Sequence, residues 1–126
     1  MEFMKVLVVD DNKKILELFS EYFALSGIEG IFAENGNNLN EIISVKNPDQ
    51  IILDMAMPKF DGFHALSEIK KSNFDFSNVV VLTAAELSET EKQKVLDYGV
   101  GNYLEKPIDL SVLKEIFSQN QKVAET

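Results

Sequence analysis

The sequence predicts an α/β fold in which five parallel strands form one sheet with helices on both of its faces. Two periodicities alternate along the chain, because short apolar runs are followed by segments whose apolar residues lie three or four positions apart. This alternation is typical of strand–helix units, and successive units of this kind form a parallel sheet. The chain has 126 residues, and no linker or internal repeat divides it. We therefore expect a single domain over residues 1–126, with right-handed crossovers.

The first strand–helix unit begins at Lys5–Asp10, which is apolar on both faces and predicts a strand covered from both sides. A wide apolar stripe at helical spacing follows this strand. The stripe consists of Ile15, Leu16, Leu18, Phe19, Tyr22, Phe23 and Leu25. Gly27 lies where a left-handed C-cap would end the helix, and Ile28–Ala33 predicts the second strand.

The second and third helices are predicted from the residues that begin them. Asn38 and Glu41 have the spacing of a capping box. Gln50–Asp54 is apolar up to its final carboxylate and predicts the third strand. Asp61 is a suitable N-cap for the third helix. The inner faces of these two helices are expected to carry Leu39, Ile42, Ile43, Phe63, Leu66 and Ile69.

The last two units follow the same plan. Val79–Thr83 predicts the fourth strand, and Ser88 with Glu91 repeats the capping-box spacing at the start of the fourth helix. Asn102–Glu105 predicts a short fifth strand, and Asp109 is the expected cap of the last helix. That helix carries Leu110, Leu113, Ile116 and Phe117. We expect a core over about residues 4–120 and a polar tail at residues 121–126.

The composition excludes several classes of protein. The net charge of −9 argues against direct nucleic-acid binding, because nucleic-acid-binding surfaces are basic. The chain has no cysteine for disulfides, and its single histidine, His64, excludes a multi-histidine metal site. The longest apolar run is too short to span a membrane, and the N-terminus lacks the pattern of a secretory signal. We therefore expect a cytoplasmic protein without a membrane segment.

Polar side chains collect at the carboxyl ends of the predicted strands, where open sheets of this type have their functional crevice. These residues are Asp10, Asp11, Asp54, Thr83 and Lys106. Two carboxylates about 4 Å apart repel each other by roughly 4 kcal/mol at an intermediate dielectric, and a Mg²⁺ ion with oxygen ligands relieves such repulsion. A carboxylate nucleophile beside a cation, a lysine and a hydroxyl donor suits phosphoryl transfer.

Each of these residues also has an ordinary structural interpretation when it is taken alone. Asp10–Asn12 is typical of a helix cap, Thr83 of a strand, and Lys106–Pro107 of a loop. Asp61–Gly62 has turn and cap chemistry, and His64 is expected to be a helix residue without a catalytic role. The functional interpretation rests on the convergence of the polar residues at one edge of one sheet.

Four segments together resemble the receiver domain of two-component response regulators, the CheY-like family. They read V-V-D-D-N at 8–12, D-M-A-M-P-K-F-D-G at 54–62, V-L-T-A at 81–84 and Y-L-E-K-P at 103–107. Their order and spacing agree with the family over residues 4–120. The resemblance implies a doubly wound (βα)5 domain with the flavodoxin-like strand order 2-1-3-4-5. It also implies a signalling switch that catalyses only its own phosphorylation and dephosphorylation, rather than an enzyme.

The resemblance implies that Asp54 accepts a phosphoryl group from a sensor histidine kinase or a histidine phosphotransfer protein. It implies a Mg²⁺ site, with Mn²⁺ as a substitute, made by Asp11, Asp54 and the backbone carbonyl of Ala56. Asp10 would act on the ion largely through water. Lys106 would bridge Asp54, and later the phosphoryl group, to the acidic pair. The peptide bond between Lys106 and Pro107 would be cis.

The resemblance further implies a switch made by Thr83 and Tyr103, in which Thr83 bonds the phosphoryl group and Tyr103 changes rotamer. The face of the fourth helix, fifth strand and fifth helix would then bind a downstream protein. This face includes Lys92, Val95, Leu96, Tyr103, Leu113 and Phe117. Ala56 and Ala85 leave no long polar side chain over the phosphoryl group, so its lifetime is open. A monomer or a weak dimer is expected.

Three other functions remain open at the level of sequence. A haloacid-dehalogenase-type phosphatase also uses an Asp nucleophile and Mg²⁺, although its second Asp would fall at Ala56. A flavodoxin-like binding module shares the strand–helix alternation but needs a Ser-, Thr- and Gly-containing loop where Asp10 and Asp11 lie. A receiver domain that binds partners without being phosphorylated is the third.

Overall fold

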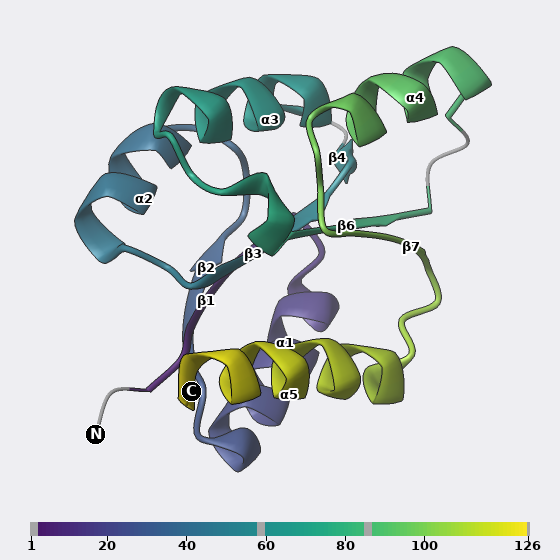
Figure 1. Ribbon diagram of the computed structural model, residues 1–126. Helices are drawn as coiled ribbons and strands as arrows, with labels where there is room; N and C mark the ends of the chain where they lie inside the picture. Colours follow the sequence, from purple (N-terminus) through teal and green to yellow (C-terminus); the bar gives the residue numbers. More distant parts are fainter. Residues whose placement is uncertain (1–2, 58–59, 85–86, 126) are drawn as a thin grey trace.

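The structure, a computed structural model, describes residues 3–57, 60–84 and 87–125, without the side chains of residues 56–57, 60–61 and 119–125. Within this part, five parallel strands form one sheet in the spatial order β2-β1-β3-β6-β7. Helices α1 and α5 cover one face, and α2, α3 and α4 cover the other (Figure 1). The predicted α/β fold with strand order 2-1-3-4-5 is confirmed, since β6 and β7 are the fourth and fifth strands of the sheet.

The elements alternate along the chain as the sequence predicts, with one addition. In chain order they are β1 Lys5–Val9, α1 Lys13–Ser26, β2 Glu29–Ala33, α2 Leu39–Lys46, β3 Gln50–Asp54, β4 Ala56–Met57, β5 Phe60–Asp61, α3 Gly62–Lys71, a 3₁₀ helix Phe76–Asn78, β6 Val79–Thr83, α4 Glu89–Asp97, β7 Asn102–Glu105 and α5 Leu110–Glu125. The addition is the small antiparallel pair β4–β5, where a turn alone was expected. Pro58, the expected turn residue, lies outside the described residues.

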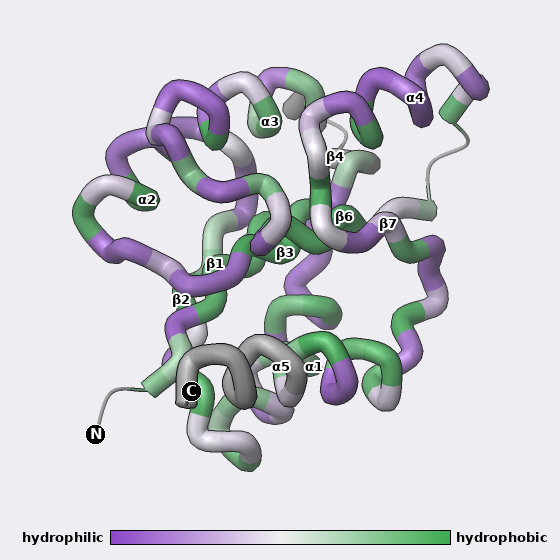
Figure 2. The backbone as a smooth tube through the Cα atoms, in the orientation of Figure 1, coloured by the Kyte–Doolittle hydropathy of each residue, from purple (hydrophilic) through white to green (hydrophobic). Residues whose placement is uncertain are grey.

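The central strands are buried on both sides because successive side chains point to opposite faces of the sheet. Along β3, Ile51 and Leu53 join the core under α2, α3 and α4, while Ile52 joins the core under α1 and α5. Figure 2 shows the resulting concentration of hydrophobic chain in β3 and β6. Helix α4 is the exception among the covering elements, since Val95 is its one buried residue.

Three predicted helix ends are confirmed by their hydrogen bonds. Gly27 has the left-handed φ of 69°, and its N–H donates to the carbonyl of Phe23. Ser88 and Glu91 form a capping box in which each side chain accepts from the other residue's N–H at 3.1 Å. Asp109 accepts from the N–H of Ser111 at 2.9 Å.

The prediction of a capping box at Asn38 is wrong. Asn38 has a left-handed backbone, with φ of 61°, and its side chain makes no cap hydrogen bond. A capping side chain needs the extended backbone that the N-cap residue ordinarily has. The expected cap role of the Asp61 side chain lies outside the described residues, although α3 does begin at Gly62, directly after it.

Two details of the helices also differ from the expectation. The stripe predicted for α1 is too wide, because Leu25 is 90% exposed and Leu18 is 36% exposed. Helix α5 runs on to Glu125, through residues that were expected to form a polar tail. Residues 119–125 contain no Gly or Pro, so nothing in their backbone chemistry stops a helix. No helix of the described residues is both long and apolar enough to cross a bilayer.

Gly101 holds the start of β7 against the 3₁₀ helix. Its N–H donates to the carbonyls of Phe76 and Val79, each at 3.0 Å. A Cβ atom at this position would collide with the backbone carbonyl oxygen of Ser77. A side chain here would therefore push apart two segments that enter neighbouring strands.

We expect Gly101→Ala to lower the free energy of unfolding by about 2–3 kcal/mol, because overpacking against backbone cannot be relieved by a rotamer change. Urea denaturation followed by circular dichroism measures this loss. Gly27→Ala is the control: its φ is positive, but a Cβ atom added there would meet no atom within 4 Å, so only about 1 kcal/mol of backbone strain is expected. Equal losses in the two variants would contradict the collision at Ser77.

Candidate functional site

The carboxyl edge of the sheet holds two buried carboxylates. Asp10 follows β1 directly and is 1% exposed, and Asp54 ends β3 and is 2% exposed. The two strands are parallel neighbours with Val9 opposite Leu53, so the next residue of each strand emerges at the same place. The sheet register therefore brings Asp10 and Asp54 together.

A third carboxylate completes an acidic cluster with these two. Asp11 is exposed, and one carboxylate oxygen from each of Asp10, Asp11 and Asp54 lies within 4.8 Å of the other two. Carboxylate oxygens are the ligands that hard divalent cations take, and an exposed member leaves room for water on the ion. The cluster can therefore hold a metal ion.

Lys106 supplies the positive charge beside the cluster. Its Nζ atom lies 3.2 Å from Oδ2 of Asp10 and 3.4 Å from Oδ2 of Asp54. Its backbone N–H donates to the carbonyl of Thr83 at 3.0 Å, so the end of β6 fixes where this lysine begins. The Lys106–Pro107 peptide bond is cis, as predicted.

The residues of the D-D-N segment have two different roles: Asn12 caps a helix, and Asp10 and Asp11 belong to the acidic cluster. Asn12 is the N-cap of α1, and its Oδ1 atom accepts from the N–H of Lys14 at 3.0 Å. The backbone N–H of Asn12 in turn donates to Oδ1 of Asp10 at 2.9 Å. The cap interpretation of Asp10–Asn12 thus applies to Asn12, and the backbone of this residue orients Asp10.

The electrostatics of Asp10 reflect its burial. Burial raises the pKa of Asp10 above its ordinary value of 3.8, and the charge of Asp54 raises it further. The N–H of Asn12 and the ammonium group of Lys106 act in the opposite direction without cancelling the increase. Burial and the charge of Asp54 therefore disfavour the ionised form of Asp10 in the folded chain.

Thr83 and Tyr103 lie on β6 and β7, the two strands that follow β3 in the sheet. Thr83 ends β6, is 1% exposed, and pairs with Glu105 across the sheet. Tyr103 is half-buried in β7, and Nζ of Lys92 on α4 lies 5.4 Å from the centre of its ring. Thr83 therefore lies at the acidic edge, whereas Tyr103 lies farther back along β7, under α4.

The remaining predicted site residues fall into two groups. Ala56 belongs to β4, while its side chain and the whole of Ala85 lie outside the described residues. Of the predicted binding face, Val95, Leu113 and Phe117 are core residues at most 2% exposed. The residues of that face which solvent reaches are Lys92, Leu96 and Tyr103.

Comparisons with known proteins give one consistent result. The family model described as the response regulator receiver domain matches residues 6–118. "Response regulator MprA" of Mycolicibacterium vanbaalenii is 31% identical over 110 residues, which are 87% of this chain and 47% of that protein. "Regulatory protein AtoC" of Escherichia coli is 34% identical over 112 residues, which are 89% of this chain and 24% of that protein. The chain thus spans half or less of the length of these relatives.

Solved structures agree with the sequence relatives. The signal receiver domain of a putative Luxo repressor protein from Vibrio parahaemolyticus superposes with a TM-score of 0.81 at 27% identity, covering 98% of this chain and 94% of that one. Chemotaxis protein CheY4 of Vibrio cholerae superposes with a TM-score of 0.79 at 28% identity, covering 94% of this chain and 98% of that one.

We expect Asp10→Asn to raise the free energy of unfolding by an amount on the order of 1–3 kcal/mol in metal-free buffer near pH 7, because it removes one of three mutually repelling carboxylates. Asparagine keeps the oxygen that accepts from the N–H of Asn12. Thermal or urea unfolding in the presence of EDTA measures the gain. Asp11→Asn is the matched control, and a smaller gain is expected because Asp11 is exposed. A loss of stability in Asp10→Asn would contradict this account.

The gain should depend on pH in a defined direction. Because the pKa of Asp10 is raised on folding, the folded chain holds this proton more tightly than the unfolded chain does. Asp10 therefore lowers the free energy of unfolding by its largest amount at a pH above its pKa in the folded chain. This decrease becomes smaller as the pH falls toward the ordinary pKa of 3.8. The difference between Asp10→Asn and the parent chain should shrink over the same range.

Proposed function

The chain belongs to the response regulator receiver domain family of two-component signalling, and from this premise we propose that it is a phosphorylation-controlled switch with Asp54 as the phosphoryl acceptor. The donor is a phosphohistidine of a sensor histidine kinase or of a histidine phosphotransfer protein. The output is a changed surface that binds a downstream protein. The domain acts only on itself, so it is a switch and not an enzyme with an external substrate.

The acidic cluster is the observation that supports this proposal. Three carboxylates have oxygens within 4.8 Å of one another, and Lys106 is the cation paired with them among the described residues. One ammonium group does not balance three carboxylates, whereas a divalent ion with oxygen ligands does. We propose Mg²⁺, for which Mn²⁺ can substitute, held by Asp11, Asp54 and the carbonyl of Ala56, with Asp10 acting through water.

The reaction is an in-line transfer to a carboxylate. An oxygen of Asp54 attacks the phosphorus atom, the new P–O bond forms, and the P–N bond to the donor imidazole breaks. The bound Mg²⁺ supplies charge neutralisation on the phosphoryl oxygens. Lys106, whose Nζ lies 3.4 Å from Oδ2 of Asp54, holds the attacking group and then bonds a phosphoryl oxygen.

The switch follows from the added charge. Phosphorylation fixes about −1.5 to −2 charges on Asp54, and this charge attracts the hydroxyl of Thr83 and the ammonium group of Lys106. Movement of Thr83 at the end of β6 frees space that Tyr103 takes up, and the surface of α4, β7 and α5 changes with it. We propose that the domain is cytoplasmic, acts as a monomer or a weak dimer, and does not itself bind nucleic acid.

The residues of the acidic edge also argue against two alternative functions, a phosphatase and a flavodoxin-like binding module. A phosphatase of the haloacid dehalogenase type needs a second acid two residues after Asp54, where Ala56 offers no proton. A flavodoxin-like module binds an anion at the first strand–helix turn, where Asp10 and Asp11 would repel it.

We expect one acid-labile phosphoryl group on the chain after incubation with acetyl phosphate and Mg²⁺. The reason is that Mg²⁺ would then neutralise the charge of the acidic cluster, and Asp54 would act as the nucleophile. Intact-mass spectrometry detects the added group, and Asp54→Asn should not acquire it. EDTA should also prevent labelling of the parent chain.

The matched control for this labelling is Asp97→Asn, which changes an exposed aspartate on α4. It should be labelled as the parent chain is. Labelling of Asp54→Asn at the parental rate would contradict the assignment of Asp54 as the phosphoryl acceptor. Labelling of the parent chain in EDTA would contradict the requirement for a metal ion.

We expect Thr83→Ala to accept the phosphoryl group while losing most of the response of the binding face, because the hydroxyl that senses the phosphoryl group is gone. Two-dimensional ¹H–¹⁵N spectra recorded before and after acetyl phosphate treatment report on the amides of Leu96 and Tyr103. Thr90→Ala, on the exposed side of α4, is the control and should keep the parental response. An undiminished response in Thr83→Ala would show that the signal bypasses Thr83.

A further inference from the structure

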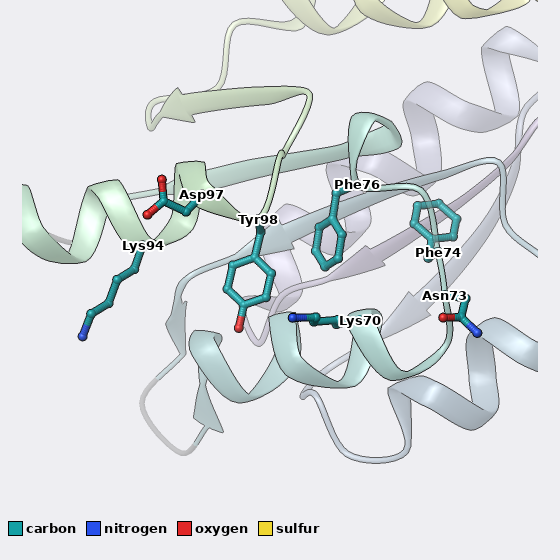
Figure 3. Close-up of a pocket in the computed structure, with 7 residues that line it drawn as sticks. All are labelled: Lys70, Asn73, Phe74, Phe76, Lys94, Asp97 and Tyr98. Carbon is teal, nitrogen blue, oxygen red and sulfur yellow. The ribbon is translucent and has the colours of Figure 1, made fainter.

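A pocket lies at the opposite edge of the sheet from the acidic cluster. Helices α3 and α4 both start near the carboxyl edge and end at the other one, and a cavity of about 520 Å³ opens between their C-terminal ends. Its lining consists of Lys70, Asn73, Phe74, Phe76, Lys94, Asp97 and Tyr98 (Figure 3). This volume is in the range of sites that take a small molecule.

Aromatic rings form the apolar part of the cavity. The rings of Phe76 and Tyr98 have centroids 5.2 Å apart and are tilted by 37°. Figure 3 shows the Phe76 ring between those of Tyr98 and Phe74, so the three rings stand in a row. All three side chains are half-buried and pack on the core under α3 and α4. The row presents ring surface to the cavity, which suits a flat apolar ligand.

The charges around the cavity favour an anion. Lys70 and Lys94 are exposed, and neither forms a close ion pair with a carboxylate of the described residues, although Lys94 interacts at longer range with Glu91. The carboxylate in the lining, Asp97, accepts a hydrogen bond from the side-chain amide of Gln93 at 2.8 Å. A chain with a net charge of −9 thus has two lysines and one engaged acid around an aromatic wall.

The two lysines differ in their relation to the cavity. Figure 3 shows Lys70 extending from α3 toward the Tyr98 ring, whereas Lys94 extends outward from α4. Lys70 is therefore placed to touch a ligand that lies on the rings, and Lys94 acts on it at longer range. Lysines in a last helical turn also complement the helix dipole, but that role gives no preference for any ligand.

We propose that this cavity binds a small aromatic carboxylate, whose ring packs on Phe76 and Tyr98 and whose carboxylate is bound by Lys70. Ring packing supplies the apolar contact, and the lysine supplies a charge-assisted hydrogen bond. The site is separate from the phosphoryl acceptor, because its residues lie at the edge of the sheet away from Asp54.

Titration of the ¹⁵N-labelled chain with indoleacetate, observed in two-dimensional ¹H–¹⁵N spectra, tests the proposal, and neutral indoleacetamide is the matched probe. We expect indoleacetate to shift the amides of Asn73, Phe76 and Tyr98 and to bind at least fivefold more tightly than the amide. Lys70→Gln should remove most of this difference and leave the affinity for indoleacetamide unchanged. Lys94→Gln should reduce the difference less.

Lys114→Gln, which removes an exposed charge of α5, is the control for a general charge effect and should leave both affinities unchanged. Absence of shifts at the lining residues, equal affinities for acid and amide, or full acid preference in Lys70→Gln would each overturn the proposal. Because Lys70 is exposed, its variant is expected to fold, and its spectrum without ligand verifies this.

Discussion

Asp10 and Asp54, which are both almost fully buried, share the ammonium group of Lys106 at 3.2 and 3.4 Å. Asp11 adds a third carboxylate, so one ammonium group faces an excess of negative charge in the metal-free chain. The arrangement also sets requirements on the rest of the chain. Strands β1 and β3 must be neighbours in register, and β6 must anchor the backbone of Lys106 through the Thr83 carbonyl. The topology of the sheet is thus what makes the charge cluster.

Much of the fold was predictable because its determinants are local. Apolar runs that end in a polar residue indicated the strands, and Ser88, Asp109 and Gly27 indicated helix ends that depend on neighbouring residues alone. The errors arose where local chemistry allowed two outcomes. Asn38 carries a capping side chain but has a left-handed backbone, and Leu25 continues a helical stripe that its neighbours in space do not cover.

The acidic edge was predictable for a different reason. Parallel strands bring their carboxyl ends to one side, so residues far apart in sequence could be grouped without knowing any distance. What the sequence could not supply was the division of roles inside the D-D-N segment, because Asp and Asn are both good caps. The cavity between α3 and α4 was also beyond prediction, since it depends on how Phe76 and Tyr98 meet across two separate connections.

Helix α4 has an unusually light attachment to the rest of the domain, since Val95 is its one buried residue. Exposing a single buried valine side chain to water costs roughly 1.5–3 kcal/mol of free energy. A new hydrogen bond to a charged group contributes roughly 1.5–3 kcal/mol. The two quantities are of similar size, so the charge added by the proposed phosphorylation of Asp54 would be enough to shift α4 from its contacts. A more deeply embedded helix would leave such a signal without effect.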